Sequence, residues 1–166
     1  MDVQFNDLLA LGDEIGGLLK ARGEKVAVAE SSAGGLLSTA LLSVAGASTF
    51  YRGGIVIYNR TSIRELAGLE MKVQMAGGVR SSSEPFAAML AESVRLRLRG
   101  DWGLSETGAA GPTGNGYGDD AGHSCCAIAG PTVETFTLET GDSDRAANML
   151  RFAHAALGHF RDRLKA

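Results

Sequence analysis

Hydrophobic positions in the N-terminal part of the chain change their spacing twice. Residues 3–23 carry apolar side chains three and four positions apart and end at Gly23, which predicts a helix. The segment 25–30 (KVAVAE) is typical of a short buried strand. Helical spacing returns in 36–46. This part of the sequence therefore predicts a strand, a Gly-Ser turn and a helix.

The middle of the chain repeats this alternation. The β-branched run 53–59 predicts a second strand, and 61–69 predicts a short helix capped by Thr61 or Ser62. Segment 81–98 begins with serine caps and predicts a helix, because one apolar side chain recurs every four residues: Phe86, Leu90, Val94 and Leu98. Residues 102–107 predict a third strand.

The C-terminal part adds a loop, a strand pair and a long helix. Residues 108–122 are too rich in Gly for regular structure, and long loops of this kind are usually functional or mobile. Segments 123–130 and 132–140 are expected to pair antiparallel, because the link between them is short. Residues 141–166 predict a helix with one inward stripe, formed by Ala146, Leu150, Ala153, Leu157, Phe160 and Leu164.

Helices that alternate with strands indicate an α/β fold whose sheet is mostly parallel and covered on both faces. The final strand pair adds an antiparallel member, so we expect a mixed sheet. We find no repeat and no linker, and interpret residues 1–166 as a single domain. A chain of this length buries roughly 70% of its unfolded surface, and its 45% hydrophobic residues argue against disorder.

Charge and composition exclude several classes of partner. Asp and Glu (19) outnumber Lys and Arg (16), which argues against nucleic acid, since duplex binding depends on a basic face. The cluster Arg95, Arg97 and Arg99 is interpreted as the solvated side of a helix end. No apolar run approaches the ~20 residues that span a bilayer, so we expect no membrane partner.

The two cysteines and the first residues favour a cytoplasmic protein. Cys125 and Cys126 are adjacent on a predicted strand and point to opposite faces, which makes a disulfide or a metal pair improbable and favours buried free thiols. Free thiols are typical of a reducing compartment. The first residues, with Asp2, Asn6 and Asp7, do not resemble a secretory signal.

Ligands in open α/β sheets bind beyond the carboxyl ends of the strands, where three unusual loops are expected. The first runs from Glu30 to Gly35. Its hydroxyls and backbone N–H groups, at a helix N-terminus, suit a phosphate or carboxylate, and glycines allow close approach. An ordinary serine cap with glycines for a tight turn is the alternative. The spacing matches neither a Walker loop nor GxGxxG.

The second and third loops are Tyr58-Asn59-Arg60 and Thr107–Pro112. Glycine N–H groups in the third loop could hold an anion or an oxyanion, or could only permit a turn. Two such loops at one sheet edge favour a site for a small anionic ligand.

The three histidines indicate no metal site, and we expect neither a metal nor a cofactor. His154 and His159 lie five positions apart on one helix, the wrong spacing for a shared metal. His123 begins a predicted strand near the Gly-rich loop and could reach the site, but we favour the interpretation that it is a surface or hydrogen-bonded structural histidine.

Three motifs together resemble the C-terminal domain of the CinA family: AESSAGGLLSTALLSVAGASTFYRGGIVIYN, ETGAAGPTGN and a final helix that begins with GD. The resemblance runs from about Val26 to the last helix. It implies a three-layer α/β/α sandwich with a mixed sheet. Stand-alone members of this family are nicotinamide mononucleotide deamidases, which convert nicotinamide mononucleotide and water to nicotinate mononucleotide and ammonia. The resemblance also allows homo-oligomerisation.

The family site contains a serine nucleophile, a lysine base and a nearby tyrosine. The resemblance assigns the nucleophile to Ser31 and the tyrosine to Tyr58. Serine attacks an amide only if a base takes its proton and donors stabilise the oxyanion. The remaining candidates, for substrate binding, are Glu30, Ser32, Gly34, Gly35, Arg60, Thr107, Gly108 and Gly111.

The sequence departs from the family pattern at the base. The lysine position is Ile63, which cannot accept a proton, and the neighbouring Arg60 and Arg64 are poor bases because they stay protonated. Further positions at which the sequence departs from the family pattern are Ala33, Asp119, Asp120, Ser143, Asn148 and Met149.

Three hypotheses about the function follow: a nicotinamide mononucleotide amidohydrolase; a catalytically impaired domain that binds a nucleotide or another small anion with a regulatory role; or an amidase with another base, such as His123 or Glu30.

Overall fold

The computed structural model describes residues 2–166, except for the side chain of Val73. A five-stranded sheet has the order β2-β1-β3-β4-β5. Its strands are β1 (Val26–Glu30), β2 (Tyr51–Val56), β3 (Trp102–Ala109), β4 (His123–Ala129) and β5 (Val133–Glu139). β1 pairs in parallel with β2 and β3, whereas β4 runs antiparallel to β3 and β5. The predicted mixed, mostly parallel sheet is confirmed, since only β4 of these five strands is reversed.

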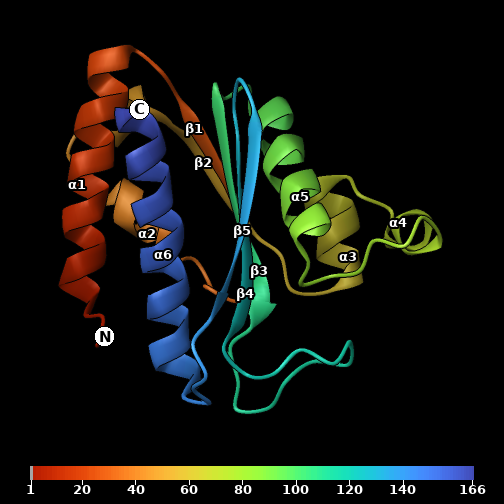
Figure 1. Cartoon of the computed structure of the whole chain (residues 1–166). Helices are drawn as coiled ribbons and strands as arrows, with labels where there is room; N and C mark the ends of the chain where they lie inside the picture. The colour runs from red at the N-terminus through yellow and green to blue at the C-terminus, as the bar shows by residue number, and fades with distance from the viewer. Residues whose placement is uncertain (1) are drawn as a thin grey trace.

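Helices cover both faces of this sheet, as Figure 1 shows. One face carries α1 (Phe5–Arg22), α2 (Leu36–Leu42) and α6 (Arg145–Lys165), with a 3₁₀ turn at Ala47–Thr49. The other carries α5 (Glu84–Arg97) and the shorter α3 (Arg60–Ser62), a π-helical turn η2 (Ile63–Ala67) and α4 (Met71–Ala76). The fold is therefore a three-layer α/β/α sandwich.

Local signals explain most helix ends. α1 stops at Gly23, whose φ of 67° is a left-handed conformation that glycine adopts without strain. Ser83 caps α5 and Asp144 caps α6, and each side chain accepts a backbone N–H of the first turn. In the predicted stripe of α6, Ala146 is exposed and Leu150 only half-buried, because the helix begins at Arg145 beyond the edge of the sheet.

The segment after β2 differs from the prediction. The strand ends at Val56, and the helix begins after Asn59, whose side chain accepts the N–H of Ser62 at 2.9 Å. Ser62 in turn accepts the backbone N–H groups of Tyr58 and Asn59. Thr61 and Ser62 were therefore wrong as cap candidates, since Ser62 is the third residue of a capping box that Asn59 opens.

The core lies on both sides of strands that are buried along their length. β1 and β4 are buried at every residue, and Trp102 packs edge-on against Phe160 of α6. Cys125 and Cys126 are free and buried, as predicted, and burial raises the pKa of both thiols. Among residues 2–166, no helix combines the length and the apolar character that crossing a bilayer requires.

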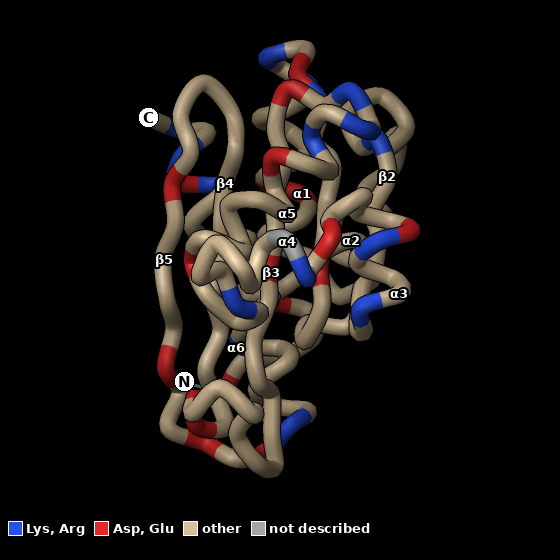
Figure 2. Tube along the Cα trace, turned by 90° about the vertical axis from the view of Figure 1, so that its right-hand side faces the viewer, with Lys and Arg blue, Asp and Glu red and all other residues tan. Residues whose placement is uncertain are grey.

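Basic and acidic residues lie together at the end of the molecule that holds the amino ends of the parallel strands (Figure 2). Arg95 and Arg97 lie in the last turn of α5, and Arg95 pairs with Glu92 at 2.7 Å. Arg97 and Arg99 are exposed, so this cluster is the solvated helix end that the sequence predicted.

Candidate functional site

The three predicted loops meet beyond the carboxyl ends of β1, β2 and β3, because these strands are parallel neighbours. A cavity of about 240 Å³ lies there, which we call the strand-end pocket. It is lined by Ser32, Tyr58, Gly108, Ala109, Ala110, Gly111, Thr113, Gly114, Asn115 and Arg145. The structure thus brings together residues from all three loops and adds the start of α6.

The first loop is organised by Glu30. This side chain is fully buried and accepts the backbone N–H groups of Gly35 (2.9 Å), Leu37 (3.1 Å) and Ser38 (3.0 Å), together with the Ser38 hydroxyl (2.6 Å). A carboxylate at a helix N-terminus satisfies orphan donors and complements the helix dipole. The expectation that the N–H groups of α2 are open to a ligand was therefore wrong: the protein's own carboxylate occupies them.

A second buried carboxylate, Glu106 of β3, lies under the same loop. It accepts the N–H groups of Ala33 (2.7 Å) and Ser31 (3.3 Å) and the hydroxyls of Ser124 (3.0 Å) and Ser32. Burial raises the pKa of Glu106, although all four hydrogen bonds favour its charged form. Sequence reasoning missed this residue because the partners of its carboxylate in the first loop lie 73 to 75 positions away in the sequence.

The two adjacent serines have different surroundings. Ser32 lines the strand-end pocket, whereas Ser31 is half-buried beside it and is not among the lining residues. Ser31 does sit at the predicted strand-to-helix bend, and its role as nucleophile stays a prediction. Gly34 and Gly35 have φ of 67° and 101°. This left-handed backbone conformation is sufficient to explain why both positions are glycine.

Other predicted residues lie away from the pocket lining. Thr107 is buried on the opposite face of β3 from Glu106 and Gly108, as strand alternation requires. Arg60 lines a separate hollow with Arg64 and Glu70. Ile63, at the family's lysine position, is buried in the apolar cluster against α5.

Arg145 connects the second and third loops. Its Nη1 donates to the carbonyl of Gly111 at 2.6 Å, and its Nη2 donates to the hydroxyl of Tyr58 at 3.3 Å. Tyr58 is 72% exposed, so its ring forms an open wall of the pocket. Sequence reasoning missed Arg145. Its position as the first residue of α6, directly after the helix cap Asp144, is the signal that could have placed it near the loops.

The third loop is held by a chain of charged contacts. Asn115, which lines the pocket, donates to Asp119 at 2.7 Å, and Arg80 binds both oxygens of Asp119 at 2.5 and 2.7 Å. The hydrogen bond from Arg80 lowers the pKa of Asp119. Asp119 therefore fixes the loop that carries Asn115.

His123, at the start of β4, follows the same loop directly and is held by two acceptors. Its Nδ1 lies 2.5 Å from Glu139 Oε1 and its Nε2 lies 3.0 Å from the carbonyl oxygen of Ser82. Burial alone lowers the pKa of His123, but these two acceptors outweigh it and raise the pKa. With both ring nitrogens engaged, His123 has the geometry of a structural histidine.

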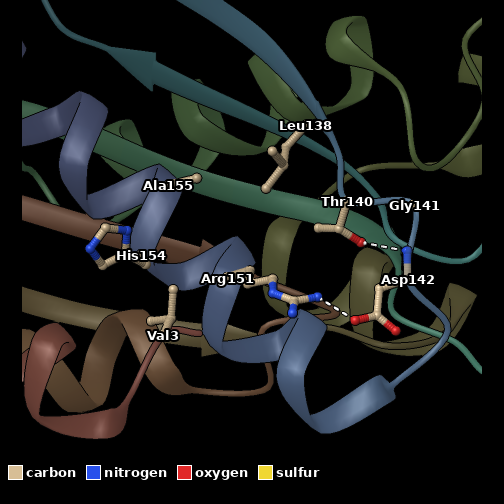
Figure 3. Close-up of a pocket in the computed structure, with 8 residues that line it drawn as sticks. All are labelled: Val3, Leu138, Thr140, Gly141, Asp142, Arg151, His154 and Ala155. Atoms are coloured by element: carbon tan, nitrogen blue, oxygen red, sulfur yellow. Dashed lines mark hydrogen bonds and ion pairs between the residues drawn. The ribbon is translucent and has the colours of Figure 1, made fainter. Parts of the chain in front are cut away.

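A larger cavity, of about 470 Å³, lies between α6, the end of β5 and Val3 (Figure 3). Its cation Arg151 pairs with Asp142 at 2.7 Å, which leaves no net positive charge from that pair for an anion. The strand-end pocket is smaller but holds the predicted loops and Arg145, so we assign the candidate site there. Within residues 2–166, no group of three His, Cys, Asp or Glu side chains is arranged for a metal.

Fold and site together define an α/β/α domain with a ligand pocket at the carboxyl ends of its parallel strands. The family model described as the CinA C-terminal domain matches residues 9–164. This chain therefore belongs to the CinA C-terminal domain family.

The curated relatives that match are longer proteins. A CinA-like protein of Rippkaea orientalis is 36% identical over 169 residues, which cover 99% of this chain and 40% of the relative. A CinA-like protein of Anaeromyxobacter sp. is 40% identical over 145 residues, covering 81% of this chain and 35% of the relative. The chain thus spans about two fifths of the length of these relatives.

Solved structures show the same fold. The CinA superfamily protein from Enterobacter cloacae superposes with a TM-score of 0.85 at 25% identity, covering 95% of this chain and 92% of that one. The competence/damage inducible protein CihA from Agrobacterium tumefaciens gives a TM-score of 0.85 at 27% identity, with 96% of each chain covered.

Proposed function

We propose that the strand-end pocket binds a small anionic ligand of the pyridine mononucleotide class. The observation that carries this proposal is Arg145, whose guanidinium lines the pocket and is fixed by Gly111 and Tyr58. Arginine has five N–H donors in a planar fork that suits phosphate, and these two contacts leave donors for a ligand.

The rest of the pocket supplies complementary groups. The Tyr58 hydroxyl accepts from Arg145, so its own proton is available to a ligand, and its exposed ring offers an apolar face to a flat pyridine. Backbone groups of Gly111, Thr113 and Gly114 line the same space. The cavity of about 240 Å³ is smaller than the roughly 300 Å³ at which ligand pockets usually begin, so a mononucleotide bound here would extend partly into solvent.

Calorimetric titration with nicotinamide mononucleotide, nicotinate mononucleotide and inorganic phosphate tests this proposal. Arg145→Ala should weaken binding at least tenfold, since a hydrogen bond to a charged group contributes about 1.5–3 kcal/mol. Arg151→Ala is the matched control, because Arg151 lines the other cavity and should leave binding unchanged. No binding by the wild type, or equal losses in both variants, would refute the proposal.

Amide hydrolysis is the second function that we propose for this pocket: nicotinamide mononucleotide and water would yield nicotinate mononucleotide and ammonia. The specific support is the hydroxyl-rich turn at Ser31 and Ser32, of which Ser32 lines the pocket together with Tyr58. Ile63 supplies no base, so a different group must take the serine proton.

Ammonia release from nicotinamide mononucleotide separates the two functions. Turnover that is lost in Ser31→Ala would establish the nucleophile that the family resemblance implies. Binding without any ammonia release would instead favour the domain that binds a small anion without catalysing this reaction.

A further inference from the structure

We propose that Ser32 and Glu106 form a nucleophile–base pair in the strand-end pocket, directed at small amides or esters that carry an anionic group. This inference rests on the proposed ligand binding in that pocket. It assigns the chemistry to a serine and a carboxylate of this chain, in place of a serine and a lysine.

Ser32 is placed as a nucleophile requires. Its side chain lines the pocket although the residue is only 5% exposed, and its hydroxyl donates directly to Glu106 Oε1. Gly108 lies beside this hydroxyl on the pocket wall: a Cβ at Gly108 would stand 3.1 Å from Ser32 Oγ and would collide with the backbone of His123 and Ser124 in β4. Glycine at this position therefore allows the close approach of β4 next to Ser32.

Glu106 is placed as a base requires. Its Oε2 is fixed by the N–H groups of Ala33 and Ser31, while its Oε1 faces the hydroxyls of Ser32 and Ser124. These four donors are neutral, so none of them cancels the negative charge. Burial raises the pKa of this carboxyl, which makes the carboxylate a stronger base than an exposed one.

The alternative bases do not contact a hydroxyl of the pocket lining. Glu30 accepts three backbone N–H groups of α2 and the Ser38 hydroxyl, and neither Glu30 nor Ser38 lines the pocket. Both ring nitrogens of His123 face acceptors. Glu106 is therefore the carboxylate that both contacts a pocket hydroxyl and has basic character.

The reaction balances with these groups. Ser32 Oγ attacks the carbonyl carbon and forms a C–O bond, while its proton passes to Glu106. The C–N bond then breaks, and the proton from Glu106 goes to the leaving nitrogen, which departs as ammonia or an amine. Water attacks the acyl-serine, gives one proton to Glu106 and releases the acid; that proton returns to Ser32 Oγ. Tyr58 and Arg145 line the same pocket, and we assign to these two donors the stabilisation of the developing oxyanion.

An alkyl fluorophosphonate tests the pair without knowledge of the substrate, because it phosphonylates an activated serine with loss of fluoride. Mass spectrometry of the labelled wild-type protein should localise the adduct to Ser32. Ser32→Ala should abolish labelling, and Glu106→Gln should slow it about a hundredfold, the typical contribution of a general base.

Ser38→Ala serves as the matched control. It removes a serine–carboxylate contact of the same kind outside the pocket and should keep the labelling rate of the wild type. An adduct on Ser31, or no adduct in the wild type, would overturn the assignment.

Ser124→Ala distinguishes a catalytic role of Glu106 from a purely structural one. It removes one donor to Oε1 and leaves Ser32 and the carboxylate in place. The pH at which labelling is half-maximal should therefore rise, since the carboxylate loses a stabilising hydrogen bond. An unchanged pH profile would contradict the proposal. Calorimetry with nicotinamide mononucleotide, run on the same samples, reports separately whether the ligand-binding proposal fails.

Discussion

Two loops that meet at the strand-end pocket are held by carboxylates in different surroundings. The turn after β1 is held by Glu30 of β1 and Glu106 of β3, which are fully buried and accept only from backbone N–H groups and hydroxyls. In the loop before β4, Asp119 is bound by Arg80. The same functional group is thus surrounded by neutral donors in one loop and by a cation in the other.

This difference separates a reactive carboxylate from an anchoring one. Arg80 lowers the pKa of Asp119 and weakens it as a base, whereas burial among neutral donors raises the pKa of Glu106. The pair of Arg80 and Asp119 fixes a loop with little desolvation of the carboxylate, since Asp119 remains partly accessible to water. The burial of Glu106 among neutral donors instead places a more basic carboxylate next to a pocket hydroxyl.

The largest expected effect is on stability when the buried carboxylate is removed. Glu106→Ala leaves four donors without their partner and should lower the free energy of unfolding by about 3–5 kcal/mol. Asp119→Ala should cost about 1–2 kcal/mol, because water can replace part of its contacts. Urea unfolding of both variants measures the comparison, and equal losses would remove the distinction between the loops.

Gly108→Ala should have the next largest effect. An added Cβ would collide with the carbonyl oxygen of His123 and come within 2.8 Å of Ser124 Cα and 3.1 Å of Ser32 Oγ, so the backbone of β4 must move away from β3. Such overpacking costs about 1–3 kcal/mol. Chemical denaturation gives this value, and the same variant should lose fluorophosphonate labelling. Gly17→Ala, which meets no neighbour within 4 Å, is the control that should keep both properties.

The pH dependence of stability should fall into two windows. A raised folded-state pKa means that the folded protein holds its proton more tightly, so the stability contribution is present at low pH and is lost as pH rises. For Glu106 this loss begins above about 4.5, the ordinary value for Glu, and for His123 it begins above about 6.5.

One variant for each pH range tests which residue causes the loss of stability there. In His123→Gln, the decrease in unfolding free energy above about pH 6.5, on the order of 1 kcal/mol, should disappear. The groups around His123 are Glu139, Asp119, Arg80 and Cys125. In Glu106→Gln the decrease above about pH 4.5 should disappear instead. A His123→Gln curve that retains the upper decrease would show that another of these groups titrates there.

Tyr58→Phe should have the smallest effect. The exposed hydroxyl contributes one 3.3 Å contact to Arg145, so the free energy of unfolding should change by less than about 0.5 kcal/mol. Nicotinamide mononucleotide affinity should fall only a few-fold, because the ring and Arg145 remain. A loss as large as that of Arg145→Ala would place the main recognition on the tyrosine hydroxyl.

Much of the fold could be predicted because its signals are local. The helix spacing of α1 and α5, the capping residues and the short link between β4 and β5 are visible within a few neighbouring residues. The error after β2 arose because Asn59 and Ser62 share a reciprocal cap, and sequence alone does not show which of the two opens it.

The site was predicted only where strand ends determine it. Ser32, Tyr58, Gly108 and Gly111 lie at the carboxyl ends of parallel strands and do line one pocket. Glu106 and Arg145 were missed because their partners are distant in sequence. Thr107 was placed at the site from its loop, although alternation along β3 turns it to the face opposite Glu106.

A titration of the ¹⁵N-labelled protein with nicotinamide mononucleotide, followed by NMR, tests the location of the site most directly. The account predicts that the amide shifts concentrate at Ser32, Tyr58, Gly108 and Gly111. Shifts concentrated at Gly141, Arg151 and His154, around the cavity of Figure 3, would contradict it.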